Sequence, residues 1–446
     1  MQDYTEQTFA FTPVRGCRVE AVFDEPAVTS DGGAVLLREI LERSQLLADI
    51  AHILGDDRRP GSVRHPALKV LRQRVAQIAC GYFRADDGDA LRDDPAMVLA
   101  AGGVPGRDSL ASQPTVSRFE NRVDRKTLLR IGYAFVDEYI RSFAGKAPGM
   151  VMLDMDPTAV TVYGQQELAL FNGFEDEYCL MPFHVYDGVT GRLITTTLRP
   201  GKTPTDREIL AILKRLVRRL RAAWPEVQIL FRADSHHTKP AVMAWLERNE
   251  LLYVTGLGPN ARLDKQFAMT IARARTLYGE TLREVRLYAS GTYAADSWGD
   301  AQRRVVCRVL VGALGVDTRY IVTNLEAPGA KFLYEMVYCD RGNAELMIKD
   351  HKLDLGSGHA SCHDATANQF RLFLHSAAYV AMHGLREALG GTALANARFS
   401  TLRVRLLKIG ARVERHARRI RLHLPTAFPL KEIFAQLANR LAPVST

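Results

Sequence analysis

The sequence predicts an α/β protein in which a mixed β-sheet covered by helices lies between a helical N-terminal region and a basic C-terminal region. Three observations predict this organisation. Apolar residues have mostly helical spacing before residue 145, strands alternate with helices from Met150 to Leu257, and the segment 376–446 holds 12 Lys and Arg against 3 Asp and Glu. Strands that are joined first by turns and then by helices are typical of a sheet with both antiparallel and parallel pairs.

The composition excludes several other classes. The 446 residues are 47% hydrophobic and 24% charged, which is ordinary for a folded protein and excludes a collagen-like, coiled-coil or wholly disordered chain. No apolar run reaches the ~18 residues that cross a bilayer, and the N-terminus has no apolar signal core, so we expect a cytoplasmic protein without a membrane partner. The six cysteines form no C-x-x-C pair and predict neither a disulfide framework nor a zinc ribbon.

The net charge of +9 is carried by the C-terminal region, because the segment 376–446 alone has an excess of nine positive charges. A basic segment on a neutral body indicates a polyanionic partner, and nucleic acid before a membrane. A solvated basic face is the simpler alternative. The basic candidates in this region are Arg403, Arg405, Arg412, Arg418 and Arg419.

The central region begins with a predicted buried strand, Met150 to Asp156, that ends in acidic residues. A helix from Pro204 to Trp224, with Thr203 as its cap, follows two more strands. The other elements predicted here are strands at 182–186, 193–198, 227–233 and 252–257 and a helix at 240–249. Residues 264–325 are predicted as a β-rich insertion, after which the chain returns to helix near Lys331.

Three acidic residues are candidates for a site on this sheet. Asp154 and Asp156 are two residues apart on a strand, so both point to the same face. Asp234 lies at the C-terminal end of another central strand, where open α/β sheets place their sites. Buried acids are costly unless a cation compensates them, so the pair of strand ends favours a metal site. For any one of these residues the alternative is a turn or a helix cap.

A third candidate element is the helix that contains Tyr338, Arg341, Glu345 and Lys352. At 100° per residue these four side chains fall within an arc of about 60°, while apolar residues occupy the opposite side. Gly342 is the weak point of this helix. The alternative is a surface helix with an Arg341–Glu345 pair. Together with the aspartates, the stripe suits phosphoryl transfer on a polyanion by two hard cations about 3.5–4 Å apart.

The spacing of these four residues resembles the YREK signature of DDE transposases of bacterial insertion sequences, in the superfamily named for insertion sequence four. The sequence is most similar to the branch named for insertion sequence thirteen-eighty. Supporting segments lie at Gly81-Tyr82 and Leu91–Pro95, Gln113–Arg118 with Glu120-Asn121, Asp154–Thr158, Leu198–Gly201, Arg232–Ser235 and Asn368–Leu372.

The resemblance implies a ribonuclease-H-like catalytic core interrupted by the β insertion. It implies that Asp156, Asp234 and Glu345 are the catalytic acids and hold two Mg²⁺ ions, for which Mn²⁺ can substitute. Asp154 remains an alternative metal ligand on the same face. The implied contacts with transposon-end DNA are made by Tyr338, Arg341 and Lys352. Trp298 either holds a flipped base, as a Trp does in relatives, or is a packed aromatic beside a turn.

The implied partners are double-stranded DNA, both the terminal inverted repeats and the target, and a second copy of the chain in the DNA complex. Excision through hairpin ends and association with the bacterial nucleoid are further implications. We expect five segments: a helical DNA-binding domain at 1–145, the first part of the core at 146–263, the insertion at 264–325, the rest of the core at 326–390, and a basic DNA-binding or dimerisation region at 391–446.

Other functions remain alternatives at this point. A catalytically decayed, transposase-derived DNA-binding protein or repressor would keep the same residues. A hydrolase that uses paired carboxylates would give no role to the basic region. His236 and His237 follow Asp234 directly, and are either phosphate or supporting contacts or a solvated pair. His359, Cys362 and His363 lack a second pair of zinc ligands at a suitable spacing.

Overall fold

The computed structural model describes residues 7–56 and 63–442 and divides the chain into two compact units. We call the first the terminal unit, because it combines Met1–Leu47, Gly55–Phe119 and Gly384–Thr446. The second, the central unit, consists of Ala48–Leu54 and Glu120–His383. The five-segment division predicted from the sequence remains a prediction.

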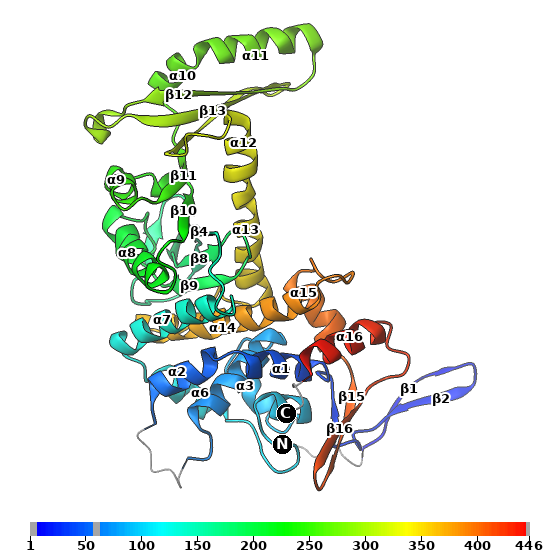
Figure 1. Cartoon of the computed structure of the whole chain (residues 1–446). Helices are drawn as coiled ribbons and strands as arrows, with labels where there is room; N and C mark the ends of the chain where they lie inside the picture. Colours follow the sequence, from blue (N-terminus) through cyan, green and yellow to red (C-terminus); the bar gives the residue numbers. More distant parts are fainter. Residues whose placement is uncertain (1–6, 57–62, 443–446) are drawn as a thin grey trace. The chain divides into compact units, whose positions relative to one another are not determined.

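The central unit is built on an eight-stranded mixed sheet, drawn in Figure 1. Its strand order is β12-β13-β14-β11-β10-β4-β8-β9. The strands are β4 (Met150–Pro157), β8 (Phe183–Asp187), β9 (Leu193–Thr197), β10 (Gln228–Ala233), β11 (Leu252–Leu257), β12 (Val285–Tyr293), β13 (Arg303–Gly312) and β14 (Gly315–Thr323). The prediction of an antiparallel start followed by parallel strands is confirmed, because β4 and β8 pair antiparallel while β10 pairs parallel with both β4 and β11.

Helices cover one face of this sheet with an apolar layer. They are α7 (Arg125–Arg141), α8 (Asp206–Ala223), α9 (Pro240–Arg248), α10 (Ala261–Gln266) and α11 (Ala268–Thr281). The buried side of α8 has helical spacing and includes Ile209, Leu213 and Leu220. Its cap is Thr205, not the predicted Thr203, because Thr205 and Glu208 form a reciprocal capping box.

The opposite face of the sheet is covered by a run of helical turns between residues 330 and 354, seen beside the sheet in Figure 1. The run consists of α12 (Ala330–Phe332), a π-helical turn (Leu333–Tyr338), a 3₁₀ turn (Cys339–Arg341), α13 (Gly342–Lys349) and a second π-helical turn (Asp350–Asp354). The predicted weak point is a real change of helix type, since α13 begins at Gly342. Leu333 and Tyr334 pack on Leu230 and Val254 of the sheet.

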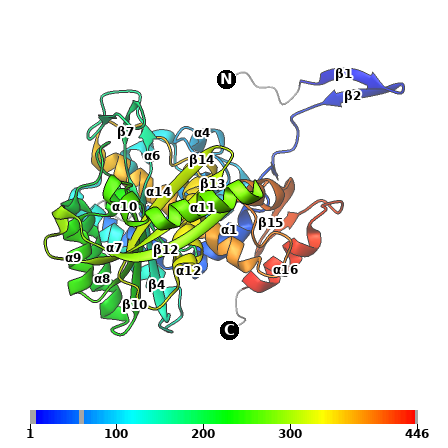
Figure 2. The ribbon, with the colours of Figure 1, turned by 90° about the horizontal axis from the view of Figure 1, so that it is seen from above.

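The β-rich insertion contains two helices that the strand-rich prediction missed. Strands β12 to β14 extend the large sheet, and α11 lies over them in Figure 2. Only Ala274 of α11 is buried, so its apolar residues form no clear stripe and give no helical signal in the sequence. A small separate sheet, β5 (Val160–Thr161), β7 (Glu177–Leu180) and β6 (Leu170–Asn172), follows β4. Among the described residues, no helix has the length and apolar content to cross a bilayer.

The terminal unit joins segments from both ends of the chain. Its helices are α1 (Ala34–Arg43), α3 (Ala67–Ala79), α4 (Asp87–Ala90), α5 (Pro95–Ala100), α15 (Phe399–Leu402) and α16 (Lys431–Leu441), and its strands include β3 (Val28–Thr29), β15 (Ala411–His416) and β16 (Arg419–His423). Three helices reach across the unit boundaries: α2 (Leu46–Leu54), α6 (Gln113–Glu120) and α14 (Ala365–Ala388). An exposed hairpin, β1 (Phe9–Val14) with β2 (Cys17–Ala21), precedes them (Figure 2).

Two close approaches hold these distant segments together. The backbone N–H groups of Gly32 and Gly33 donate to the carbonyls of Ile409 and Leu407, at 2.8 and 3.1 Å. A Cβ atom at Gly33 would lie 1.8 Å from the carbonyl oxygen of Leu406, so only glycine fits there. An ion pair with a buried carboxylate adds to this contact, because the Nζ atom of the half-buried Lys408 lies 2.7 Å from an oxygen of the fully buried Asp31.

We expect Lys408→Met to destabilise the terminal unit by about 3–5 kcal/mol, because it leaves the fully buried Asp31 carboxylate without its cation. Urea unfolding of the full chain measures this loss. The double variant Asp31→Asn/Lys408→Met should recover much of it. Arg412→Met, which removes an exposed pair with Glu414 on the same segment, should cost about 0–1 kcal/mol. Equal losses of unfolding free energy for Lys408→Met and Arg412→Met would show that the pair of Lys408 with Asp31 does not stabilise the terminal unit.

Candidate active site

The first acidic residue of the site, Asp156, lies at the end of β4 beside the helical run that covers the sheet. Nη1 of Arg341 donates to Oδ2 of Asp156 at 2.9 Å. Burial raises the pKa of Asp156 to about 7; Arg341 lowers it, while the charges of Asp234 and Glu345 raise it. Both carboxylates are therefore close enough to act on Asp156. The predicted acids Asp234 and Glu345 thus lie within electrostatic range of Asp156.

Asp234 follows β10, which is the parallel neighbour of β4. The register pairs Asp154 with Arg232, so Asp156 and Asp234 follow two residues later on adjacent strands. This is the edge at which the sequence predicted a site.

Two histidines hold the Asp234 carboxylate. Oδ1 accepts from the His236 backbone N–H at 2.9 Å and lies 2.8 Å from Nδ1 of His237, and Oδ2 lies 2.9 Å from Nδ1 of His236. Burial alone would raise the pKa of Asp234, but the histidine contacts outweigh it and bring the pKa far below its ordinary value. His237 is fully buried between the rings of Phe183 and Phe231, and burial lowers its pKa. Of the alternatives for His236 and His237, the structure shows supporting contacts with the Asp234 carboxylate.

Glu345 lies in the first turn of α13 and is exposed, while Ala344 and Met347 of the same helix are buried. Its charge raises the pKa values of both Asp156 and Arg341. The predicted separation of a polar stripe from an apolar face is therefore present around Glu345. Arg341 bonds to Asp156, and the charges of Asp156, Asp234 and Glu345 raise its pKa against the effect of burial.

Asp154 shares the face of Asp156 but has a different environment. Its two oxygens accept from Nε and Nη2 of Arg232, both at 2.6 Å, and both side chains are almost fully buried. Nη1 of Arg232 also donates to the carbonyl of Val337 at 2.7 Å and to Asp340 at 3.3 Å. Arg232 therefore ties β4, β10 and the helical run to one another.

The sequence pattern alone did not predict this role of Arg232. The signal was present, since an arginine in the otherwise apolar strand from Val227 to Ala233 needs a buried acceptor. Which acceptor it finds depends on the register between two strands whose paired residues are 78 positions apart.

Tyr338 and Lys352 lie on either side of α13 along the helical run. The Tyr338 ring lies 5.8 Å from the Arg341 guanidinium and 5.7 Å from the Tyr334 ring. A Cβ atom at Gly256 of β11 would lie 2.7 Å from the Tyr338 hydroxyl, so the close approach requires glycine. Lys352 lies on the second π-helical turn, with its side chain next to Gly358.

Trp298 does not present its ring to solvent. It is 9% exposed, belongs to the main apolar core, and packs edge-on against Tyr293 at 5.5 Å. The Arg303 guanidinium lies 5.1 Å from the centre of its ring. Of the two alternatives for Trp298, this environment favours the packed aromatic.

The basic candidates of the C-terminal region, Arg403, Arg405, Arg412, Arg418 and Arg419, belong to the terminal unit and divide into two kinds. Arg403 is half-buried, donates to the Ala79 carbonyl at 2.9 Å, and lies over the Phe83 ring, so it has a structural role. Arg405 is exposed on a π-helical turn. Arg412, Arg418 and Arg419 are exposed on β15, β16 and the turn between them.

The three acids have the chemistry to hold divalent cations. Carboxylate oxygens are the ligands that Mg²⁺ and Mn²⁺ prefer, and a cation at this edge would offset the burial and the neighbouring negative charges that raise the pKa of Asp156. As they stand, no three Asp, Glu, His or Cys side chains in the described parts of the chain lie close enough to surround one ion. Arg341 is paired with Asp156 instead.

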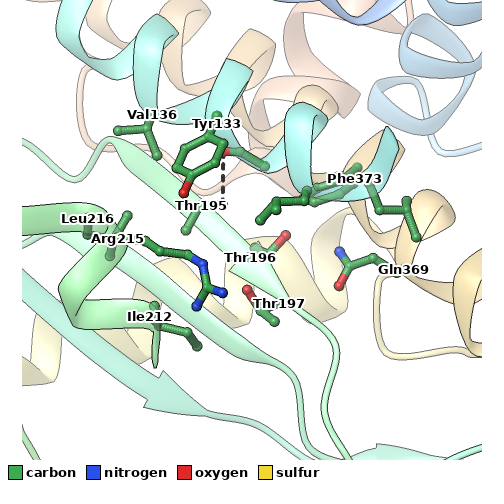
Figure 3. A pocket seen from close by; sticks show the side chains of 13 residues that line it. Tyr133, Val136, Thr195, Thr196, Thr197, Ile212, Arg215, Leu216, Gln369 and Phe373 are labelled. Atoms are coloured by element: carbon green, nitrogen blue, oxygen red, sulfur yellow. Dashed lines mark hydrogen bonds between the residues drawn. The ribbon is translucent and has the colours of Figure 1, made fainter. Parts of the chain in front are cut away.

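A separate cavity of the central unit has a different character. It measures about 170 Å³ and lies between α7, α8, α14 and β9 (Figure 3). Its walls are mostly apolar, with Tyr133, Thr195 and Gln369 among the residues that line it. No carboxylate lines it, so we do not assign the chemistry to it.

The geometry defines an α/β protein with an acidic centre at the carboxyl ends of parallel strands, next to an arginine- and tyrosine-bearing helix. A family model described as Transposase DDE domain group 1 matches residues 11–446, and the chain belongs to this family. It is thus a transposase of the DDE class, a class of enzymes that cleave DNA and transfer its strands.

Two other comparisons add less. A solved piggyBac transposase, in a synaptic complex with hairpin DNA, is similar over 97% of this chain and 84% of that chain, at 11% identity and a TM-score of 0.43. No curated protein matches the sequence. The assignment therefore rests on the family match.

Proposed function

We propose that this transposase cleaves the terminal inverted repeats of an insertion sequence and joins the released 3′ ends to target DNA. In this proposal Asp156, Asp234 and Glu345 are the catalytic acids of a ribonuclease-H-like core. The observation that carries it is geometric: the register of β4 and β10 places Asp156 and Asp234 at the same edge of the sheet, and Arg341 of the helical run that bears Glu345 bonds to Asp156. We place the protein in the superfamily named for insertion sequence four, in the branch named for insertion sequence thirteen-eighty.

Asp156, not Asp154, is the first acid in this mechanism. Both oxygens of Asp154 are engaged by Arg232, and the pair is almost completely buried. Asp156 is paired with Arg341, a long side chain that can exchange this carboxylate for another acceptor. Asp154 acts through Arg232, which fixes the helical run that carries Glu345 against the sheet.

The three acids would hold two Mg²⁺ or Mn²⁺ ions, which supply activation of a water or 3′-hydroxyl nucleophile and stabilise the leaving oxygen. The protein residues do the positioning. His236 and His237 keep the Asp234 carboxylate ionised and oriented. Arg341, once it leaves Asp156, can bind a DNA phosphate beside Tyr338, and Lys352 can bind a phosphate further along the same helical run. Because both ends of the element must be cut, we propose that two copies of the chain act together in the DNA complex. We also propose that excision passes through hairpin ends.

The test uses duplex oligonucleotides that carry the DNA at either border of the coding region, incubated with the full chain and Mg²⁺. We expect a cut that leaves a 3′-hydroxyl, followed by joining to a second duplex. Binding of these duplexes without any cleavage, in Mg²⁺ or Mn²⁺, would contradict the proposal and favour a DNA-binding protein without catalysis.

Metal binding can be measured without DNA. We expect Mg²⁺ at about 100 times its Kd to stabilise the folded chain by about 2.7 kcal/mol, seen as a rise in Tm of at least ~3 °C. Asp156→Asn and Asp234→Asn should lose this rise. An equal rise in the variants would show that the ions bind elsewhere.

A further inference from the structure

The terminal unit contains two adjoining hollows that share Arg107 and Arg415. One measures about 660 Å³ and lies between the loop 104–109 and Val413 of β15. The other measures about 490 Å³ and lies between the same loop and the turn that joins β15 to β16. We call the two together the arginine groove. Its basic residues are Arg64, Arg92, Arg107, Arg415, Arg418 and Arg419.

The arginines of the groove form no ion pair with a carboxylate of the described residues, unlike Arg412 on the same hairpin, which pairs with Glu414. Arg64 donates to the Ser109 hydroxyl at 3.2 Å, and the other five have no carboxylate within ion-pair distance among the described residues. Two acids line the groove, Asp93 and Asp108. The carboxylate of Asp108 is already bound by Lys69 and by the Val104 backbone N–H, so Asp93 is the acid that can offset the charge of the arginines. The six exposed arginines around the arginine groove repel one another, which favours the binding of a polyanion there.

The groove has ordered walls. In the loop, the carboxylate of Asp108 accepts from the Val104 N–H at 2.8 Å, and the Val104 carbonyl accepts from two N–H groups of the loop. On the other side, β15 and β16 pair in register up to His416 and Arg419, so Arg415, Arg418 and Arg419 extend from a tight hairpin. The backbone positions of these arginines are therefore fixed before a ligand binds, and only their side chains have to be ordered.

We propose that the arginine groove binds the sugar-phosphate backbone of duplex DNA, an inference that rests on the proposed function. Arg64, Arg92 and Arg107 come from the N-terminal part of the chain and Arg415, Arg418 and Arg419 from the C-terminal part, so one site combines both ends of the sequence. A membrane surface is a poorer partner, because no large hydrophobic residue in the loop 104–109 or in β15 and β16 is exposed as an anchor. Backbone contacts position a protein on DNA without reading its sequence.

The test is the affinity of the full chain for the border duplex as a function of salt. Arg107→Glu/Arg415→Glu should weaken binding at least about tenfold and lower the salt slope by about 2, by the same factor for a scrambled duplex. Arg107→Gln/Arg415→Gln is the milder variant for use if charge reversal impairs folding. The matched control is Arg215→Glu/Arg218→Glu, which makes the same charge change on exposed residues of α8 and should leave affinity nearly unchanged.

Each outcome decides the proposal. Equal weakening in the control would mean that total charge alone governs binding, and unchanged binding in both groove variants would also overturn the site. Loss of binding to phosphatidylserine vesicles with DNA affinity intact would assign the groove to membranes instead. Groove-dependent binding by a protein that never cleaves would uphold the groove while refuting the proposed function. Cleavage by a protein whose DNA affinity is unchanged in the groove variants would refute the groove and uphold the proposed function.

Discussion

Asp234→Asn should abolish cleavage while leaving the affinity for border DNA almost unchanged. The carboxylate lies at the edge where β4 and β10 end, and its charge acts on Asp156 and Arg341. Losing a metal-holding carboxylate removes several kcal/mol of transition-state stabilisation, so we expect a rate at least ~10³-fold lower. The measurement is single-turnover cleavage of a labelled border duplex in saturating Mg²⁺.

Asp156→Asn should give a loss of the same size. Asp176→Asn, at an exposed position away from the acidic centre and the groove, is the control for the change of one acid to its amide. The binding measurement separates chemistry from recognition, since both catalytic variants keep the arginine groove. A variant at Asp156 or Asp234 that cleaves at the wild-type rate would remove that residue from the mechanism.

Arg232→Met is expected to destabilise the central unit strongly. Arg232 makes two hydrogen bonds to Asp154 and two more to the helical run, all from a fully buried position. Its loss leaves the Asp154 carboxylate buried without a cation, which should lower the free energy of unfolding by about 3–5 kcal/mol. Urea denaturation of the full chain gives this value. Arg262→Met, which breaks an exposed pair with Asp296, should cost at most about 1 kcal/mol.

A double variant separates the stability effect from positioning. Arg232→Met/Asp154→Leu replaces the buried pair by apolar side chains and should regain most of the stability. It should still cleave slowly and need more Mg²⁺, because the helical run that carries Glu345 has lost its bonds from Arg232. Full activity of the double variant at the wild-type Mg²⁺ concentration would show that Arg232 has no positioning role.

The acidic centre could be predicted largely because it depends on local rules. The period of two along a strand places Asp154 and Asp156 on one face, and a strand end next to a parallel neighbour places Asp234 beside them. Helical periodicity separates Glu345 from the buried Ala344 and Met347. The catalytic roles of these residues remain predictions.

Other features depend on contacts between distant segments, which the sequence pattern does not contain. The acceptor of Arg232 follows from strand register, and the environment of Trp298 follows from how Tyr293 and Arg303 pack around it. The helix α11 was missed because most of its surface is exposed. The contact between the N-terminal and C-terminal segments depends on Gly33 and Lys408. The sequence alone does not show that Gly33 lies against Leu406 or that Lys408 pairs with Asp31.

The interleaved order of the two units has a consequence for protein synthesis. A ribosome completes the central unit when it reaches His383, but the terminal unit lacks a whole segment until residues 384–446 have been added. A messenger that is truncated soon after His383 yields a chain with all three acids and only half of the arginine groove. The groove is therefore completed only after the acidic centre has been translated.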